Sequence, residues 1–261
     1  MVLSVSEIRS PYESDLTFPP ALSFFTPYLS YYIREILRIG GEAYVSRSSA
    51  DTVSGVFIYD ATEKTGTIFT RSRGVFDHFL ELKPFDFLFS EIKSEHESEP
   101  YDIYTLDLEN VAFSHNFRHE ISVADHGRVD EVEEFMLQEN PRMNRRWVRV
   151  AFDDGEKCFV VKLEDDFVGL GWLSIVNGIG RFHSLYVKPQ FRGLGIGEDI
   201  FFARLLWLKS KHAISAFSEI SRENPGSSRI ALKGGMKVCG QIFQYFRTST
   251  GPKASKASPK L

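Results

Sequence analysis

One stretch of the chain, residues 182–202, constrains the fold more than any other. It reads FHSLYVKPQFRGLGIGEDIFF, an apolar strand pattern that passes through an arginine- and glycine-rich loop into a helix pattern. Three glycines at alternate positions, Gly193, Gly195 and Gly197, lack the Cβ atoms that would keep a ligand away from the backbone. Backbone N–H groups at the start of a helix bind anions, because the helix dipole favours negative charge there. The stretch therefore predicts a pyrophosphate-binding loop, to which Arg192 adds a cation.

Two familiar phosphate-binding patterns do not fit this loop. The P-loop ends in glycine, lysine and a hydroxyl residue, and the loop lacks that ending. The dinucleotide fingerprint G-x-G-x-x-G needs a third glycine where Glu198 stands. Its first glycine also follows the strand directly, whereas residues 188–192 intervene here. A structural glycine turn that binds nothing is the remaining alternative.

The run LYVKPQFRGLGIG, from Leu185 to Gly197, resembles the central signature of the GNAT superfamily of N-acetyltransferases. That signature is Arg/Gln-x-x-Gly-x-Gly/Ala after a strand that ends in Val-x-Pro, and Arg192, Gly195 and Gly197 stand at its three fixed positions. The flanking sequence agrees from about residue 119 to 247, which is one whole domain of the family. The resemblance implies the mixed α/β fold of that family and an acyl-CoA ligand, and it implies much less about the acceptor.

The order of elements around the loop agrees with this resemblance, although periodicity alone predicts only a mixed α/β domain. Asn177-Gly178 predicts a tight hairpin turn, and Asp165-Asp166 predicts the turn before it. The expected strands are residues 121–123, 157–164, 168–176, 180–187, 213–220 and 241–247. The expected helices are residues 124–138, 198–211 and 225–233.

The first 117 residues are too many for a linker and too apolar for a disordered segment. We expect a helix with an aromatic face at 20–39, which fits a core or a dimer face equally well. Strands are expected at 43–47, 53–59 and 66–72, and a helix at 75–82. The pairs Gly55–Gly66 and Gly169–Gly180 are both eleven residues apart, so this order echoes the later strands.

We therefore expect three parts in the chain. Residues 1–117 form an N-terminal α/β domain, which is a degenerate second GNAT-like domain unless the two strand patterns are similar by chance. Residues 118–248 form the GNAT domain, and residues 249–261 form a disordered basic tail.

The resemblance implies direct transfer of an acetyl group from acetyl-CoA to an amine, with no covalent enzyme intermediate. By position, the Leu185 N–H would face the thioester oxygen, and Val187 would bind the pantetheine amide. Asn224 matches an asparagine that contacts the pantetheine. The implied cofactor-binding residues are Leu185, Tyr186, Val187, Arg192, Gly193, Leu194, Gly195, Ile196, Gly197, Glu198 and Asn224.

Two positions depart from the family pattern. Ala231 stands where many members carry a tyrosine that protonates the leaving thiolate, so Ser227, Ser228 or water would have to replace it. Ile179 stands where some members carry a glutamate that acts as general base.

His183 is the first candidate for the missing base, because an imidazole accepts a proton near neutral pH. We expect it on the same strand face as Leu185, with Tyr186 on the opposite face. The alternative is that His183 only packs in the core. Glu164 and Tyr245 are reserve candidates.

Composition limits the class of protein. No run of 18 apolar residues and no signal-peptide pattern occur, so we expect neither a membrane span nor secretion. Cys158 and Cys239 form no disulfide framework and no metal-binding pattern, so we expect a cytoplasmic protein without a metal.

Charge suggests possible partners. From Asn224 onward the chain has seven lysines and arginines and no acid, which suits either nucleic acid or the phosphates of coenzyme A. No nucleic-acid-binding motif occurs, so that partner ranks last. An acetyltransferase is the leading hypothesis, and a non-catalytic acyl-CoA-binding sensor or scaffold is the alternative. The acceptor amine and the oligomeric state are left open.

Overall fold

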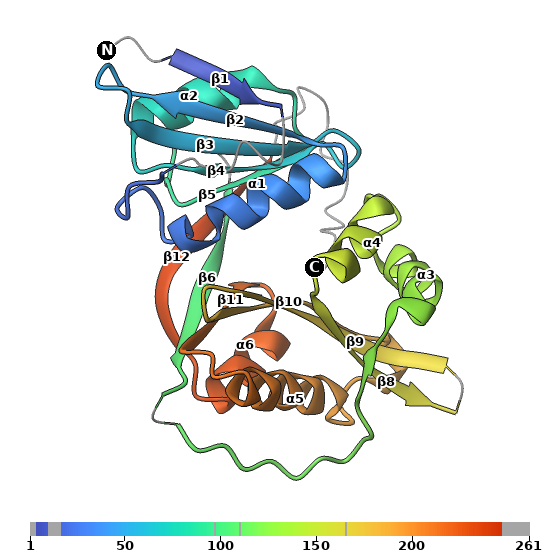
Figure 1. The fold of residues 1–261 in the computed structure, drawn as a ribbon. Coiled ribbons are helices and arrows are strands. Elements are labelled where there is room, and N and C mark those ends of the chain that lie inside the picture. Colours follow the sequence, from blue (N-terminus) through green and yellow to red (C-terminus); the bar gives the residue numbers. More distant parts are fainter. Residues whose placement is uncertain (1–3, 10–16, 97, 110, 165, 247–261) are drawn as a thin grey trace. The chain divides into compact units, whose positions relative to one another are not determined.

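The computed structural model describes residues 4–9, 17–96, 98–109, 111–164 and 166–246 (Figure 1). The chain divides into two compact units. Of the described residues, unit 1 holds those within 4–100, 142–150 and 241–246, and unit 2 holds those within 101–141 and 151–240. Neither unit is a continuous stretch of chain. The expected division of the chain into residues 1–117, 118–248 and 249–261 stays a prediction.

Three expectations fall outside the described residues. They are the disordered tail at 249–261, Asp165 of the turn before β9, and the final residue of the strand expected at 241–247.

Unit 1 contains six strands that lie side by side in the order β1-β2-β3-β4-β5-β12. Neighbouring strands are antiparallel except β4 and β5, which run parallel. The strands are β1 (Ser4–Ile8), β2 (Glu42–Arg47), β3 (Val53–Asp60), β4 (Thr65–Phe69), β5 (Phe87–Ser90) and the last part of β12 (Lys237–Phe246).

Aromatic rings fill the core of unit 1. A 3-10 turn at Thr26–Tyr28 buries Tyr28, and helix α1 (Leu29–Arg38), which follows it, buries Tyr31 and Tyr32. The ring of Tyr32 stacks on Phe69 with the centroids 5.5 Å apart. Helix α2 (Arg73–Leu82) contributes the buried Phe76 and Phe79. The aromatic face of the first helix is therefore part of the core.

Unit 2 contains six strands that lie side by side in the order β6-β11-β10-β9-β8-β7. Its neighbours are antiparallel except β10 and β11, which run parallel. The strands are β6 (Ser98–Asp107), β7 (Ser122–Ala124), β8 (Lys157–Leu163), β9 (Asp166–Val176), β10 (Ile179–Val187) and β11 (Ser215–Ser221). Asn177 and Gly178 both have positive φ angles, so the hairpin turn expected from their sequence is confirmed.

The remaining helices are α3 (Val129–Glu139), α4 (Arg146–Asp153), α5 (Ile196–Ser210) and α6 (Pro225–Lys233), with 3-10 turns at His126–Arg128 and Pro189–Phe191. Helix α5 buries Ile200, Leu205 and Leu208 against the sheet of unit 2 (Figure 1). A glycine in β10 permits this close approach, because a Cβ on Gly180 would lie 2.4 Å from Leu208 Cδ1. Helix α5 is thereby held close to the sheet.

The two units share one connectivity. In each, the first strand leads through a helical segment to three antiparallel strands, then a helix, then a strand parallel to the last of the three. The sixth strand is taken from the other part of the chain, since residues 101–107 of β6 pair with β11 and residues 243–246 of β12 pair with β5. The internal similarity seen in the glycine spacing thus reflects a repeated fold.

Candidate active site

The parallel strands β10 and β11 pair at only three positions and then separate. The paired residues are Ile179–Arg181 in β10 and Ser215–Phe217 in β11. One side-chain bond follows, in which Ser218 Oγ donates to the Phe182 carbonyl at 2.9 Å. Among the described residues, the stretch 183–187 of β10 therefore has an edge outside the ladder with β11.

The backbone N–H groups of Leu185 and Val187 face this open edge. Lys188 N donates to the carbonyl of Val168 in β9 at 2.9 Å, and Tyr186 pairs with Leu170 in β9. Because N–H groups alternate sides along a strand, those of Leu185 and Val187 point away from β9. They are the two groups that the resemblance assigns to the thioester and the pantetheine.

A β-bulge at Ser184 changes which side chains share a face of β10. The pairing register with β9 shifts between His183 and Tyr186, and Ser184 has a φ of +49°. One extra residue reverses the alternation of side chains. The expectation that His183 and Leu185 lie on the same face is therefore wrong.

Contacts on the two faces show the outcome. His183 pairs with Trp172, and their rings stack with centroids 6.4 Å apart. The ring of Tyr186 lies 5.6 Å from that of Phe135 in α3. Leu185 packs instead against the core beneath α5. Tyr186 thus lies opposite Leu185 as expected, and His183 lies on the face of Tyr186.

The glycine loop enters α5 through two residues in the left-handed conformation. Gly193 has φ +83°, and Gly195, the N-cap of α5, has φ +89°. The first helical bond runs from Asp199 N to Gly195 O at 3.0 Å. The N–H groups of residues 196–198 lie before it in the first turn of a fifteen-residue helix, where no intrahelical acceptor exists. Such a turn suits a pyrophosphate. The space beside Gly193 is open, since a Cβ there would meet no atom within 4 Å, whereas the Arg118 side chain covers Gly195.

Arg192 is directed along the strand. Its Nε donates to the Val187 carbonyl at 3.0 Å, and its guanidinium lies 5.6 Å from the ring centre of Tyr186. Burial, together with a hydrogen bond to Glu139, raises the pKa of Tyr186 to about 12. Tyr186 is therefore neutral at physiological pH and contributes an aromatic surface.

Glu198 carries a carboxylate at the mouth of the glycine loop. Lys233 Nζ of α6 lies 2.6 Å from its Oε1, and Arg118 Nη2 lies 3.4 Å from its Oε2. Sequence reasoning included Glu198 for its backbone N–H and missed both cations. The position of Lys233 could have been expected from the sequence, because it lies in the last turn of the helix expected at 225–233. No sequence pattern places Arg118 near the loop.

His183 makes a buried pair with Glu156, which lies just before β8. The distance from His183 Nε2 to Glu156 Oε2 is 3.0 Å, and the two side chains are only 10% and 2% exposed. Burial lowers the pKa of His183 below its ordinary value, although Glu156 counteracts part of that shift. The imidazole is therefore neutral at pH 7 and able to accept a proton. Nearby on β10, Arg181 Nε pairs with Glu219 Oε1 of β11 at 3.2 Å.

The two family positions around α6, Ala231 and Asn224, offer no side chain with an ordinary acidic proton for the leaving thiolate. Ala231 is fully buried in the core, so the place of the family tyrosine holds a packing residue. Asn224 caps α6, where its Oδ1 accepts from Ser227 N at 3.1 Å. Its amide nitrogen is then the group that it can offer to a ligand.

The reserve candidates are not brought to this site. Glu164 is exposed at the end of β8, next to the turn into β9. Tyr245 belongs to unit 1, where its hydroxyl donates to the Ile92 carbonyl and accepts from Ser94 N at 3.0 Å.

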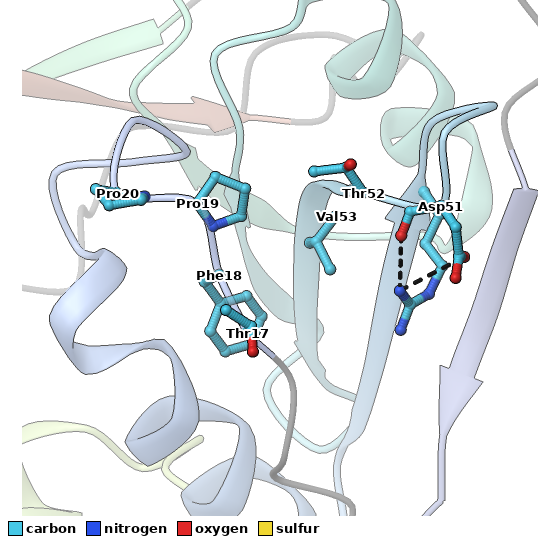
Figure 2. A pocket seen from close by; sticks show the side chains of 8 residues that line it. Thr17, Phe18, Pro19, Pro20, Asp51, Thr52 and Val53 are labelled. Atoms are coloured by element: carbon cyan, nitrogen blue, oxygen red, sulfur yellow. Dashed lines mark hydrogen bonds and ion pairs between the residues drawn. The ribbon is translucent and has the colours of Figure 1, made fainter.

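A hollow in unit 1 has no comparable chemistry (Figure 2). It is lined by Thr17–Pro20 and by the turn between β2 and β3, including Arg47 and Asp51. Arg47 Nη1 lies 3.6 Å from Asp51 Oδ1, so the cation of this hollow is already paired.

Other site types find no support within the part of the chain that the structure describes. No group of three His, Cys, Asp or Glu side chains there is arranged so that it could hold a metal ion. No helix among those residues is long and apolar enough to cross a membrane. Cys158 is buried and Cys239 exposed, and both are free thiols.

Comparison with known proteins agrees with this geometry. Residues 107–233 match the acetyltransferase (GNAT) family. A search of curated proteins finds no match.

Three solved structures are similar over nearly the whole chain. A GCN5-related N-acetyltransferase from Sphaerobacter thermophilus is 10% identical with a TM-score of 0.62, and the match covers 94% of this chain and 95% of that one. A Drosophila protein is 12% identical with a TM-score of 0.65, covering 93% and 98%. A tandem GNAT protein from the clavulanic acid biosynthesis pathway is 14% identical with a TM-score of 0.61, covering 97% and 100%.

At these identities the solved structures show a shared fold, and the family match shows where the acetyltransferase domain lies. The fold is the mixed α/β fold of that family with an additional N-terminal α/β part. Residues 107–233 of the chain form a domain of the GNAT acetyltransferase family.

Proposed function

We propose that this protein transfers an acetyl group from acetyl-CoA to an amine by direct attack on the thioester. The observation that carries the proposal is the separation of β10 from β11, which opens the backbone of residues 183–187 immediately before the glycine loop. One strand thus presents N–H groups to the thioester arm, and the following loop presents N–H groups to the pyrophosphate.

Binding would use mainly backbone groups. The Leu185 N–H would donate to the thioester oxygen, and the Val187 N–H would donate to a pantetheine carbonyl. The pyrophosphate would lie on the loop residues Arg192, Gly193, Leu194, Gly195, Ile196, Gly197 and Glu198. Tyr186 would form an apolar wall, and Asn224 would offer its amide nitrogen to the pantetheine.

Acetyl-CoA supplies the activated acyl group when bound, and the chain supplies orientation and proton transfer. His183 would accept the proton of the attacking amine, and Glu156 would hold the imidazole in place through the 3.0 Å contact. As the carbonyl oxygen gains negative charge, the Leu185 N–H would stabilise it. The C–S bond then breaks, and Ser227, Ser228 or water would protonate the thiolate because Ala231 cannot.

The bulge at Ser184 supports this division of roles. It places His183 on the face opposite the side chain of Leu185, while the Leu185 N–H lies at the open edge between the two faces. An amine that approaches from the His183 face would meet a thioester carbonyl polarised from the edge. Direct attack needs the base beside the attacking amine and the oxyanion donor beside the carbonyl oxygen, both held in a fixed orientation.

The first test is binding. Thermal unfolding of the wild type is measured with and without acetyl-CoA, beside Gly195→Glu and the control Gly74→Glu. Gly74 lies in the first turn of α2, where a Cβ would meet no atom within 4 Å. A ligand at about 100 times its dissociation constant adds about 2.7 kcal/mol of stability. We expect that stabilisation in the wild type and in Gly74→Glu, and its loss in Gly195→Glu.

The second test is turnover. Free thiol is measured during incubation of the protein and acetyl-CoA with a panel of primary amines that includes polyamines and lysine peptides. Amine-dependent thiol release supports the enzyme. Binding without release for any amine would favour the alternative, a non-catalytic acyl-CoA-binding sensor or scaffold. That alternative draws on the buried Ala231 and on Ile179, which place no ionisable side chain at two family positions.

Other expectations remain predictions. They are a cytoplasmic location and the absence of a nucleic-acid partner. The expected absence of a metal is likewise a prediction.

A further inference from the structure

Arg118 lies over the glycine loop. It belongs to residues 113–119, a segment without helix or strand that we name the strap. A Cβ built on Gly195 would lie 2.4 Å from Arg118 Cζ, so the guanidinium occupies the space above this loop residue. The side chain is 52% exposed, and its pairing with Glu198 spans 3.4 Å. A cation thus stands at the mouth of the anion site, from outside the glycine signature.

The strap is held in place by one buried carboxylate. Asp199, in the first turn of α5, is fully buried. His115 Nε2 lies 2.6 Å from its Oδ1, and His119 Nδ1 lies 2.8 Å from its Oδ2. The backbone N–H groups of Arg118 and His119 also donate to Oδ2, at 3.0 and 3.1 Å. Two side chains and two backbone groups therefore fix the position of the Arg118 Cα.

Further contacts extend this attachment along α5. The ring of His115 stacks on Phe202 with centroids 4.2 Å apart and an interplanar angle of 8°. Lys209 Nζ donates to the Val111 carbonyl and lies 5.6 Å from the ring centre of Phe113. The backbone that carries Arg118 is thus bound to the helix that carries the loop, so most of the cost of placing a cation there is met before a ligand arrives.

The charges around the loop leave Arg118 able to change partner. Glu198 also pairs with Lys233 at 2.6 Å, a shorter contact than the one with Arg118. An arriving pyrophosphate brings more negative charge than one carboxylate, and a guanidinium binds phosphate oxygens through two parallel hydrogen bonds. Lys233 can continue to balance Glu198 after Arg118 has turned away.

We propose that Arg118 binds the pyrophosphate of the acyl-CoA, exchanging Glu198 for it when the ligand enters. This inference rests on the proposed function, because it names a further binding residue of the same site. The strap, through Asp199, is the device that positions it.

The experiment is calorimetric titration of the full chain with acetyl-CoA and with acetyl-dephospho-CoA, which keeps the pyrophosphate and lacks the 3′-phosphate. Loss of a hydrogen bond between charged groups weakens binding by about 10- to 100-fold. We expect that loss in Arg118→Ala for both ligands, and a smaller loss in Arg118→Lys, which keeps the charge without the fork. If the loss disappears with acetyl-dephospho-CoA, Arg118 binds the 3′-phosphate and the inference is overturned.

The same Arg118 substitution in a Glu198→Gln protein distinguishes two roles of Arg118: contact with the pyrophosphate, and neutralisation of the Glu198 carboxylate. If Arg118 only balances that carboxylate, then Arg118→Ala should have no effect in a Glu198→Gln protein. If Arg118 contacts the pyrophosphate, the loss should persist in that background at about 10-fold or more. An unchanged dissociation constant in the double variant would overturn the inference.

The control is Lys211→Ala, which removes the same charge from the exposed C-terminal end of α5, roughly 20 Å along the helix axis. We expect its affinity to equal that of the wild type, and a loss as large as in Arg118→Ala would point to net charge alone. The thermal unfolding midpoint of each variant without ligand checks that it folds. If the wild type itself binds no acetyl-CoA, the proposed function fails, whereas equal binding by the wild type and Arg118→Ala defeats only this inference.

Discussion

His183 and Leu185 are two residues apart in β10, and their side chains lie on opposite faces of the strand. The left-handed Ser184 between them causes this. In an uninterrupted strand both side chains would lie on one face, with the backbone N–H of Leu185 still at the edge. The bulge therefore gives the imidazole a face apart from the core that Leu185 helps to fill.

Replacing His183 tests its role as base. In His183→Gln we expect turnover to fall by about 10²- to 10⁴-fold, because the proton of the amine loses its acceptor. The dissociation constant for acetyl-CoA should stay unchanged, since the ligand contacts come from the edge and the loop. Thiol release and calorimetry measure the two quantities. Full activity in this variant would mean that His183 only packs against Trp172.

The fall of kcat/KM at low pH, which is the acid limb of its pH profile, tests the pairing of Glu156 with His183. Burial lowers the pKa of His183, so kcat/KM should fall only as the pH drops below about 6.5. Glu156 favours the protonated imidazole, so Glu156→Gln should move this limb to still lower pH and also reduce kcat by loosening the ring. A limb that moves upward, or does not move, contradicts the pairing.

The bulge itself can be tested by stability. Ser184→Val places a β-branched side chain at a φ of +49°, and we expect it to lower the free energy of unfolding by about 1–2 kcal/mol. Ser184→Gly should stay close to the wild type, because glycine accepts this conformation at an entropic cost of similar size to the strain it removes. Urea unfolding of the three proteins measures the difference. Equal stability of the valine variant would show that residue 184 does not hold a left-handed conformation.

Two glycines near α6 should respond in opposite directions. A Cβ on Gly234 would lie 2.1 Å from Phe201 Cε1, so Gly234→Ala should cost about 1–3 kcal/mol of stability through overpacking. A Cβ on Gly226, inside α6, would have its nearest neighbour at 3.6 Å, so Gly226→Ala should add about 0.5–1 kcal/mol. Thermal unfolding of both variants is the measurement, and a common sign would contradict the packing of α5 against α6.

Asp199 should give a pH-dependent stability. Burial alone would raise its pKa, but the hydrogen bonds from His115, His119 and the Arg118 N–H outweigh burial and lower it. A lowered pKa in the folded state means that the stabilisation is present above the ordinary value near 4 and is lost as the pH falls further.

Asp199→Asn should therefore destabilise the protein by about 1–3 kcal/mol at pH 7, and the difference from the wild type should shrink below about pH 4. Denaturant unfolding at several pH values measures it. Affinity for acetyl-CoA should fall as well, because the strap no longer fixes Arg118. A difference that stays constant down to pH 3 would indicate a packing defect instead.

The sequence predicted those parts of the site whose signals are local. The helix expected at 225–233 has the same bounds in the structure, because Asn224 caps one end and two glycines end the other. The glycine loop was recognisable since its φ angles require glycine at Gly193 and Gly195.

The parts that the sequence did not predict depend on contacts between residues distant in sequence, or on strand patterns that neighbouring acidic residues obscure. Arg118 reaches the loop only because Asp199, about eighty residues later, binds the strap. A serine in a strand carries no signal for a left-handed bulge. Strand β6 does show alternation at Tyr101 and Ile103, but it lies in a segment whose acidic residues obscured it.

The exchange of the sixth strands determines the order in which the two units can fold while the chain is being synthesised. When a ribosome has released residues 1–240, the first five strands of unit 1 exist, but the strand that pairs with β5 does not. Residues 101–107, in turn, wait for β11 to emerge more than a hundred residues later. Unit 1 therefore cannot complete its strand order during translation until residues 243–246 emerge, and a fragment that starts at residue 118 would lack the strand that pairs with β11. The two copies of the fold therefore become complete at different times, and the copy that carries the glycine loop is complete before the other.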